Sequence, residues 1–258
     1  MQSEPSALAV GDSASTRWFV PLVEDPDRPV RVLGMPNAGA GCAALAECAA
    51  AVSSDIAVYG LNLPGRQARF TEAARTDLGP LLDEIVADLR TYADRPYVLF
   101  GYCSGALLAY LTAQGARAAG VAAPQALVVV SYCAPHLAVP AADLHTLPSE
   151  QFWTRIIAGG GVSGQLTAQP GFQEVFEPAL RADYEMLAGF RHTHTQPLDI
   201  PVIAVAGDRD PLLHRDDATA WADHTTATFE LRLLPGDHWL LATAATELAG
   251  ILESACHR

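Results

Sequence analysis

The stretch VLFGYCSGALLAY, residues 98–110, joins two apolar runs through a segment that contains two glycines. A short apolar run before a glycine-bounded turn is typical of a buried strand, and a longer apolar run after it is typical of a helix. Gly101 and Gly105 flank Cys103 at the spacing of a strand-to-helix turn that lifts one side chain clear of a sheet. Glycine at both positions relieves the crowding of such a turn. The stretch therefore predicts Cys103 at the apex.

The predicted position of Cys103 favours a chemical role. A helix that begins just after the apex directs N–H groups and the positive end of its dipole at that point, which stabilises developing negative charge. We interpret Cys103 as a candidate nucleophile; the alternative is a packing residue, a common use of buried cysteine. Ser104 is a competing nucleophile, but it follows the apex and its side chain is expected to point away. The backbone N–H of Ser104, and not its hydroxyl, is then the group expected to take part in the chemistry at the turn.

Outward from this stretch, strand-like and helix-like segments alternate, which predicts an α/β fold with a mostly parallel sheet flanked by helices. The expected strands are short runs rich in Val, Ile, Leu and aromatic residues: Trp18–Leu22, Val30–Met35, Ile56–Leu63, Tyr97–Phe100, Ala126–Ser131, Pro201–Ala206 and Phe229–Leu234. The expected helices are Cys42–Ala51, Leu78–Tyr92, Ser104–Ala119, Asp216–Asp223 and Trp239–Ala255.

The alternation stops between residues 135 and 197. Helical pieces at Ser149–Ile157 and Phe172–Phe190 are joined there by the breakers AGGGVSGQ and AQPG. We expect a helical insertion, residues 135–197, that covers the sheet edge, with residues 1–134 and 198–258 forming the core. The glycines at 159–161 could act as hinges, and an insertion without mobility is the alternative.

Composition excludes several classes of protein. The 258 residues carry a net charge of −13, which disfavours nucleic acid and anionic membranes as partners. All 16 basic residues are arginine, which excludes Schiff-base lysine chemistry and the lysine of a P-loop. The five cysteines show no metal-ligand spacing and are expected to be free thiols. With no secretory signal and no apolar run of membrane-spanning length, we expect a cytoplasmic protein.

A nucleophile at such a turn needs an acid and a histidine, which follow it in that order in this architecture. The strand IPVIAVAG continues into Asp208 and Asp210, and the strand FELRLLPG continues into Asp237 and His238. His238 is the candidate base, Asp237 is expected to be a turn residue, and spacing alone leaves Asp208 and Asp210 open. The pair in RHTHT, residues 191–195, has no carboxylate or cysteine at ligand spacing, so no metal site is expected.

The loop MPNAGAGCAA, residues 35–44, superficially fits a dinucleotide-binding fingerprint. That interpretation requires an acidic residue at the end of the next strand, which instead reads VYGLNLPGR. We expect the loop to form an oxyanion hole, in which the N–H of Ala38 faces the N–H of Ser104. One such donor contributes about 3 kcal/mol to transition-state stabilisation.

The ordered set of motifs resembles the type II thioesterases of polyketide and nonribosomal peptide assembly lines, within the α/β-hydrolase superfamily. It consists of MPNAGAG, LNLPGR, FGYCSGALLAY, APH, LRADYEML, GDRDPL, WADHTTATFELRLLPG and GDHWLL, and it extends from about Arg31 to Leu241. The resemblance implies Cys103 as nucleophile, Asp210 as the orienting acid and His238 as base. It also implies the N–H groups of Ala38 and Ser104 as oxyanion hole and the insertion as a lid.

The resemblance further implies a substrate: an acyl group held as a thioester on the phosphopantetheine of an acyl or peptidyl carrier protein, with no cofactor. Arg66, Arg69 and Arg75 are candidates for a basic docking area, and scattered surface arginines are the alternative. A free-standing esterase or acyl-CoA hydrolase and a non-catalytic binding protein of the same fold are the competing functions.

The elbow departs from the family, which usually has His-Ser-Met where this chain has Tyr102-Cys103-Ser104. A cysteine would form a second thioester in place of an ester, so the acyl group would stay activated. The expected reaction is therefore hydrolysis of a specialised substrate or its release by transfer or cyclisation.

Overall fold

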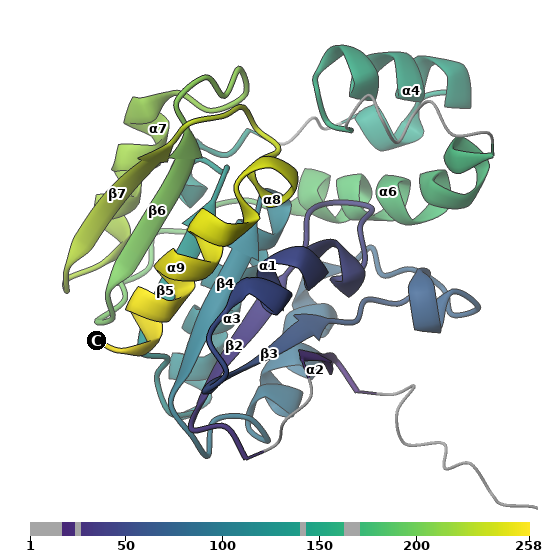
Figure 1. The fold of residues 1–258 in the computed structure, drawn as a ribbon. Helices are drawn as coiled ribbons and strands as arrows, with labels where there is room; N and C mark the ends of the chain where they lie inside the picture. The colour runs from purple at the N-terminus through teal and green to yellow at the C-terminus, as the bar shows by residue number, and fades with distance from the viewer. Residues whose placement is uncertain (1–16, 24–26, 140–142, 163–170) are drawn as a thin grey trace, which may run out of the picture.

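A computed structural model describes residues 17–23, 27–139, 143–162 and 171–258. Within these residues one seven-stranded sheet has the order β1-β3-β2-β4-β5-β6-β7 (Figure 1). Only β1 runs antiparallel, against β3. The strands are β1 Phe19–Val23, β2 Val30–Met35, β3 Ile56–Leu61, β4 Tyr97–Tyr102, β5 Ala126–Val130, β6 Val202–Gly207 and β7 Phe229–Leu234. The prediction of a mostly parallel sheet is confirmed.

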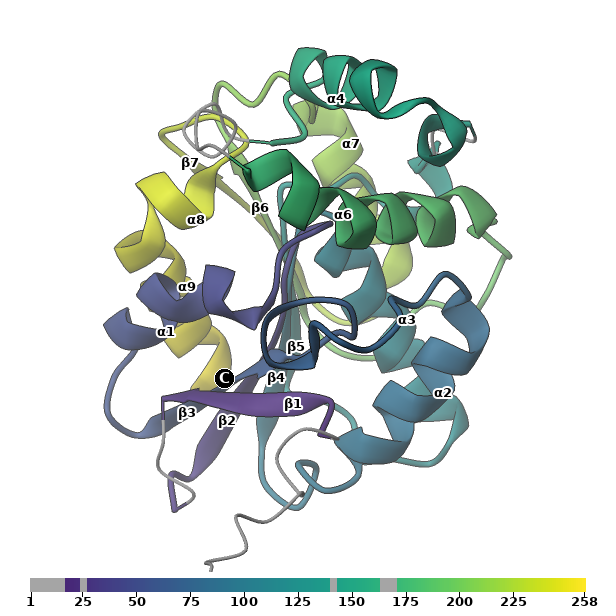
Figure 2. The same ribbon diagram turned by 90° about the vertical axis from the view of Figure 1, so that its right-hand side faces the viewer.

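Helices cover both faces of the sheet, as continuous apolar strands require (Figure 2). On one face lie α2 Leu78–Leu89 and α3 Ser104–Ala118; on the other lie α1 Ala46–Ala51, α8 Leu240–Thr243 and α9 Ala245–Cys256. The helix α7 Arg215–Thr219 follows β6. Short 3-10 helices occupy Cys42–Leu45, Gln67–Arg69, Pro135–Leu137, Leu144–Thr146 and Ala220–His224.

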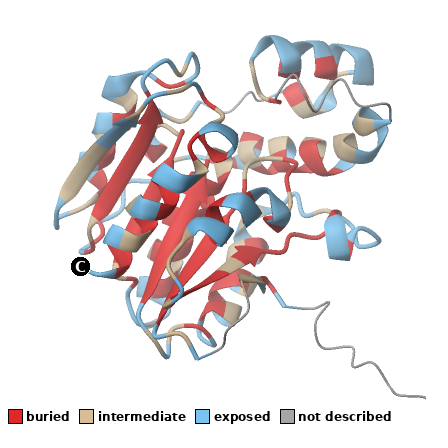
Figure 3. Ribbon diagram, in the orientation of Figure 1, coloured by how far each residue is buried: buried red, intermediate tan, exposed pale blue. Residues whose placement is uncertain are grey.

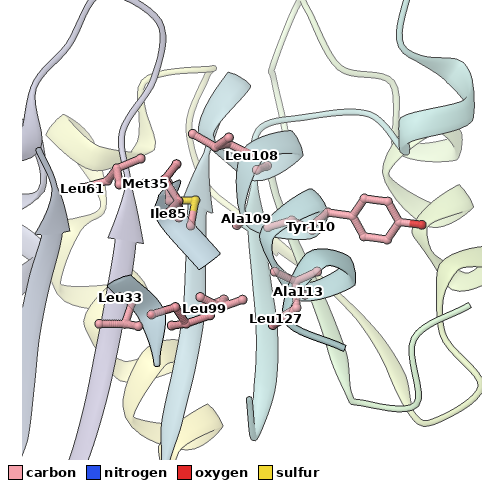
Figure 4. Packing of buried hydrophobic residues seen from close by; sticks show 14 of the residues in the cluster. Leu33, Met35, Leu61, Ile85, Leu99, Leu108, Ala109, Tyr110, Ala113 and Leu127 are labelled. Atoms are coloured by element: carbon pink, nitrogen blue, oxygen red, sulfur yellow. The ribbon is translucent and has the colours of Figure 1, made fainter. Parts of the chain in front are cut away.

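The parallel register sorts strand side chains into two cores. Leu33, Leu99 and Leu127 are aligned across β2, β4 and β5 and pack on the side of α2 and α3 (Figure 4). Val32 and Val98 are aligned one residue earlier and pack on the side of α1 and α9. The central strands are therefore buried on both faces (Figure 3).

Within the insertion, α4 Ser149–Ala158 and α6 Phe172–Gly189 lie beyond the carboxyl edge of the sheet (Figure 2). They share a small apolar core of their own: Leu144, Phe152, Trp153, Ile156, Val162 and Leu180. Residues 163–165 of the predicted breaker AGGGVSGQ and residues 168–170 of AQPG lie outside the described residues. The domain boundaries and the glycine hinges stay predictions.

Several helix predictions were wrong in extent. Cys42–Ala51 is divided between a 3-10 helix and α1, and Leu78–Tyr92 ends at Leu89. Trp239–Ala255 is divided between α8 and α9 because Ala244, at φ −141° and ψ 35°, leaves the helical conformation. Asp216–Asp223 is divided between α7 and a 3-10 helix. Alanine favours helix, so burial of Leu240 and Ala244 in the core overrides the local preference.

We predict that Gly105→Ala destabilises the fold by about 1–3 kcal/mol, because a Cβ there would meet the Met35 carbonyl oxygen at 2.2 Å. The control is Gly250→Ala in α9, where a Cβ would meet nothing within 4 Å. That substitution should stabilise the protein by about 0.5–1 kcal/mol. Urea unfolding measures both, and equal effects would contradict the prediction.

Candidate active site

Cys103 lies at a strained turn between β4 and α3. Its φ of 52° is in the left-handed region, where a residue with a side chain is rarely found. The turn is held by a hydrogen bond of 2.8 Å from the Cys103 N–H to the Val130 carbonyl. A Cβ on Gly101 would meet the Gly105 carbonyl oxygen at 2.3 Å. The turn thus requires glycine at 101 and presents Cys103 at the carboxyl edge of the sheet.

The loops after β6 and β7 meet beside this turn. A Cβ on Gly207 would meet the Asp237 carbonyl oxygen at 2.3 Å, so only glycine allows this approach. The Asp208 carboxylate accepts a hydrogen bond of 2.9 Å from the Gly236 N–H, and this bond ties the two loops together.

Asp210, and not Asp208, contacts the histidine. Asp210 Oδ2 lies 2.9 Å from His238 Nδ1, and both side chains are buried. The other Asp210 oxygen accepts a hydrogen bond of 2.8 Å from the Leu212 N–H. Asp237 accepts one of 2.9 Å from the Trp239 N–H, as a turn residue does. Of the two aspartates that spacing left open, Asp210 is therefore the one within hydrogen-bond distance of His238.

The surroundings of His238 favour its protonated form. Burial lowers the pKa of His238, but interactions with the Asp210 carboxylate and the Cys103 sulfur outweigh burial and raise that pKa to about 10. His238 thus lies between the Asp210 carboxylate and the Cys103 sulfur.

Tyr102 contacts the backbone of His238, and sequence reasoning missed this contact. Its hydroxyl donates a hydrogen bond of 2.5 Å to the His238 carbonyl oxygen, and its ring is buried. Burial raises the pKa of Tyr102, so the phenol stays a neutral donor. No sequence signal identifies this bond, because its acceptor is a backbone atom 136 residues away.

Ala38 faces the same space as the sulfur. Asn37, Ala38, Cys103 and His238 line a cavity of about 200 Å³, together with Ser131, Cys133, Tyr184 and Trp239. A second cavity of about 380 Å³ shares Asn37, Ala38 and Trp239 with the first and extends towards α1 and α8. No described residue accepts a hydrogen bond from the Ala38 N–H. Ser104 begins α3, where helix geometry leaves the N–H without a helical partner.

The predicted basic docking area was wrong for Arg66 and Arg69. Both side chains are buried: Arg66 pairs with Asp183, and Arg69 pairs with Glu72 and lies 4.6 Å from the centre of the Trp18 ring. Because the carboxylates of Asp183 and Glu72 bind these two guanidinium groups in the interior, neither arginine is available on the surface for docking. Arg75 is half exposed and pairs with Glu84.

The histidine pair predicted not to bind metal lies near other histidines. His192 packs near His136 and His224, and His136 Nδ1 lies 2.7 Å from His224 Nε2. Among the described residues no group of three or more His, Cys, Asp or Glu side chains has a metal-binding arrangement. In the same part of the chain, no helix has the length and apolarity to span a membrane.

We predict that the free energy of unfolding falls as the pH rises from about 8.5 towards 10, by up to about 1.4 kcal/mol per pH unit; below about 8.5, a proton that His238 takes from Cys103 is matched by the proton that an unfolded thiol retains. The pKa of His238 is higher in the folded protein than in the unfolded chain. The interactions that stabilise protonated His238 are therefore complete below the unfolded-state pKa, and they are lost as the pH rises through the folded-state pKa. Urea unfolding at about pH 8.5, 9 and 9.5 measures the slope. His238→Gln should lack this component, and identical slopes in the two proteins would contradict the prediction.

Comparisons with known proteins identify the family of this chain. The Thioesterase domain family matches residues 31–256. The gramicidin S biosynthesis protein GrsT of Aneurinibacillus migulanus is 26% identical, with 92% of each chain covered. The type II thioesterase BorB from the borrelidin biosynthetic cluster has a TM-score of 0.85 at 27% identity, covering 93% of this chain and 97% of its own.

The RedJ thioesterase from the prodiginine pathway of Streptomyces coelicolor has a TM-score of 0.82 at 31% identity, covering 92% of this chain and 95% of its own. The seven-stranded sheet with helices on both faces is the α/β-hydrolase fold. Because the family match spans nearly the whole chain, this protein belongs to the thioesterase family and is a hydrolase that acts on thioesters.

Proposed function

We propose that this thioesterase acts on acyl groups carried by acyl or peptidyl carrier proteins of polyketide or nonribosomal peptide biosynthesis, through a covalent acyl-Cys103 intermediate. The observation that carries the proposal is the placement of Cys103 at the strained turn, beside the His238–Asp210 pair and on the wall of a cavity. The pathway is supported by the similarity to GrsT, BorB and RedJ.

The first half of the reaction transfers the acyl group to the protein. His238 accepts the Cys103 proton, and the thiolate attacks the carbonyl carbon of the substrate thioester. The N–H groups of Ala38 and Ser104 stabilise the resulting oxyanion. The bond from that carbon to the pantetheine sulfur then breaks, and the leaving sulfur takes the proton from His238. Asp210 keeps the imidazole oriented through both proton transfers.

The second half depends on the sulfur. Acyl-Cys103 is a thioester, as the substrate is, so the transfer is close to energetically neutral and the acyl group stays activated. An incoming water, amine or hydroxyl attacks the carbonyl, gives its proton to His238, and displaces the Cys103 sulfur, which is reprotonated. The intermediate can thus be released by hydrolysis, by transfer or by cyclisation.

Removal of the sulfur tests the nucleophile. We expect Cys103→Ala to lower kcat on an acyl-loaded carrier protein by about 10³-fold or more. The matched control is Cys256→Ala, which removes a buried thiol from α9 and should leave kcat within about threefold. Full activity of Cys103→Ala would contradict the proposal.

Replacement of sulfur by oxygen tests the fate of the intermediate. With a primary amine added, wild type should form a larger share of amide over free acid than Cys103→Ser, because amines attack thioesters more readily than oxygen esters. Chromatography of the two products gives the ratio, and equal ratios would contradict a thioester intermediate. Faster turnover of soluble esters or acyl-CoA than of acyl-carrier protein would favour the esterase or acyl-CoA hydrolase function.

A further inference from the structure

A buried ion pair joins the lid to the loop that contains Ala38. Asp183 lies on α6 and is 4% exposed, and Arg66 follows β3 and is 6% exposed. The pair is bidentate, with Arg66 Nη1 2.6 Å from Asp183 Oδ2 and Nη2 2.8 Å from Oδ1. Such geometry fixes the carboxylate in one orientation.

The same carboxylate binds the backbone next to Ala38. Asp183 Oδ2 also accepts a hydrogen bond of 2.7 Å from the Gly39 N–H. Arg66 Nη1 donates one of 3.3 Å to the Ala40 carbonyl oxygen, and Arg66 Nε donates one of 3.3 Å to Pro64. The ion pair therefore holds the loop at two consecutive residues, through one donor and one acceptor.

These bonds select the conformation of the turn at Asn37–Ala40. The Ala40 N–H donates to the Asn37 carbonyl at 3.1 Å, and the φ of Gly39 is 74°. A type II turn requires a positive φ at its third residue, here Gly39. The central peptide of such a turn, which here joins Ala38 to Gly39, faces the opposite way from the central peptide of a type I turn. That central peptide supplies the N–H bound by Asp183. The carboxylate thus fixes the peptide that directly follows the Ala38 N–H.

α6 also packs directly on this turn. A Cβ on Gly39 would meet Phe176 at 2.6 Å and Leu180 at 2.8 Å, both on α6. Ala38 itself packs against the apolar core of the lid. α6 crosses above the carboxyl edge of the sheet, and the turn that it contacts lines the same cavity as Cys103 (Figure 2).

We propose that Arg66 and Asp183 are positioning residues for the oxyanion hole: they lock the Asn37–Ala40 turn so that the Ala38 N–H faces the cavity of Cys103. The proposal rests on the proposed function, in which Ala38 supplies an oxyanion donor. It assigns a role to two sequence motifs outside the catalytic residues, LNLPGR and LRADYEML. It also makes α6 and the oxyanion hole a single unit, so that displacement of α6 would switch off acyl transfer.

The test separates oxyanion stabilisation from thiol reactivity. Acyl transfer from a pantetheine thioester needs the oxyanion hole, whereas alkylation of Cys103 by iodoacetamide forms no oxyanion. The double variant Arg66→Met with Asp183→Leu replaces the ion pair by apolar groups of similar size, which proteins tolerate better than one unpaired buried charge. It should lower kcat about 100-fold, with KM and the Cys103 alkylation rate changed less than about threefold.

Two further variants complete the design. Arg66→Gln with Asp183→Asn keeps a side-chain oxygen for the Gly39 N–H and should recover at least about tenfold of the lost kcat. The Arg66→Gln, Asp183→Asn variant also tests the proposal if the Arg66→Met, Asp183→Leu variant fails to fold. In that case the kcat of the Gln/Asn variant must exceed the kcat of the single variant Asp183→Leu. Glu177→Gln is the matched control, because Glu177 forms an ion pair on α6 that does not touch the turn, and it should leave kcat within about threefold.

An unchanged kcat in the apolar variant, or an equal loss of alkylation and acyl transfer, would overturn the proposal. Failure of the proposed function gives a different result: wild type alkylated at Cys103 would stay active. Mass mapping of the alkylated peptide distinguishes Cys103 from the other four free cysteines, Cys42, Cys48, Cys133 and Cys256.

Discussion

The close approach of backbone segments around Cys103 is the constraint on which the whole site depends. Gly105 brings the start of α3 against the Met35 and Pro36 carbonyls at the end of β2. Gly207 brings the end of β6 against the loop of His238. A Cβ at either position would meet a backbone oxygen at 2.2 or 2.3 Å, so the segments would have to move apart. Cys103, Asp210, His238 and the loop of Ala38 come from four different strand ends, and these glycine contacts hold them within reach of one another.

Much of this arrangement could be predicted from local patterns. Apolar runs of strand length alternating with helical runs indicate a parallel sheet, and a parallel sheet brings strand ends to one edge. That rule alone placed Cys103 near the loops of Asp210 and His238. It could not choose between Asp208 and Asp210, because both lie in the same loop and only the hydrogen bonds of Gly236 and His238 separate their roles.

Charged residues were harder to interpret than apolar ones. An arginine in a polar loop suggests solvent exposure, yet Arg66 is buried because its partner Asp183 arrives from a helix 117 residues later. No periodicity connects two such positions. Tyr102 is similar, since its bond to a backbone carbonyl leaves no trace in sequence spacing. Long-range polar contacts of this kind therefore account for much of what the structure adds around Cys103 and Ala38.

The most direct test of a nucleophilic Cys103 is the mass of the protein after brief incubation with an acyl-pantetheine thioester and acid quenching. We predict an added acyl mass on the peptide that contains Cys103 and no such mass in Cys103→Ala. Absence of an adduct at Cys103 in wild type, together with undiminished turnover by Cys103→Ala, would contradict the central claim.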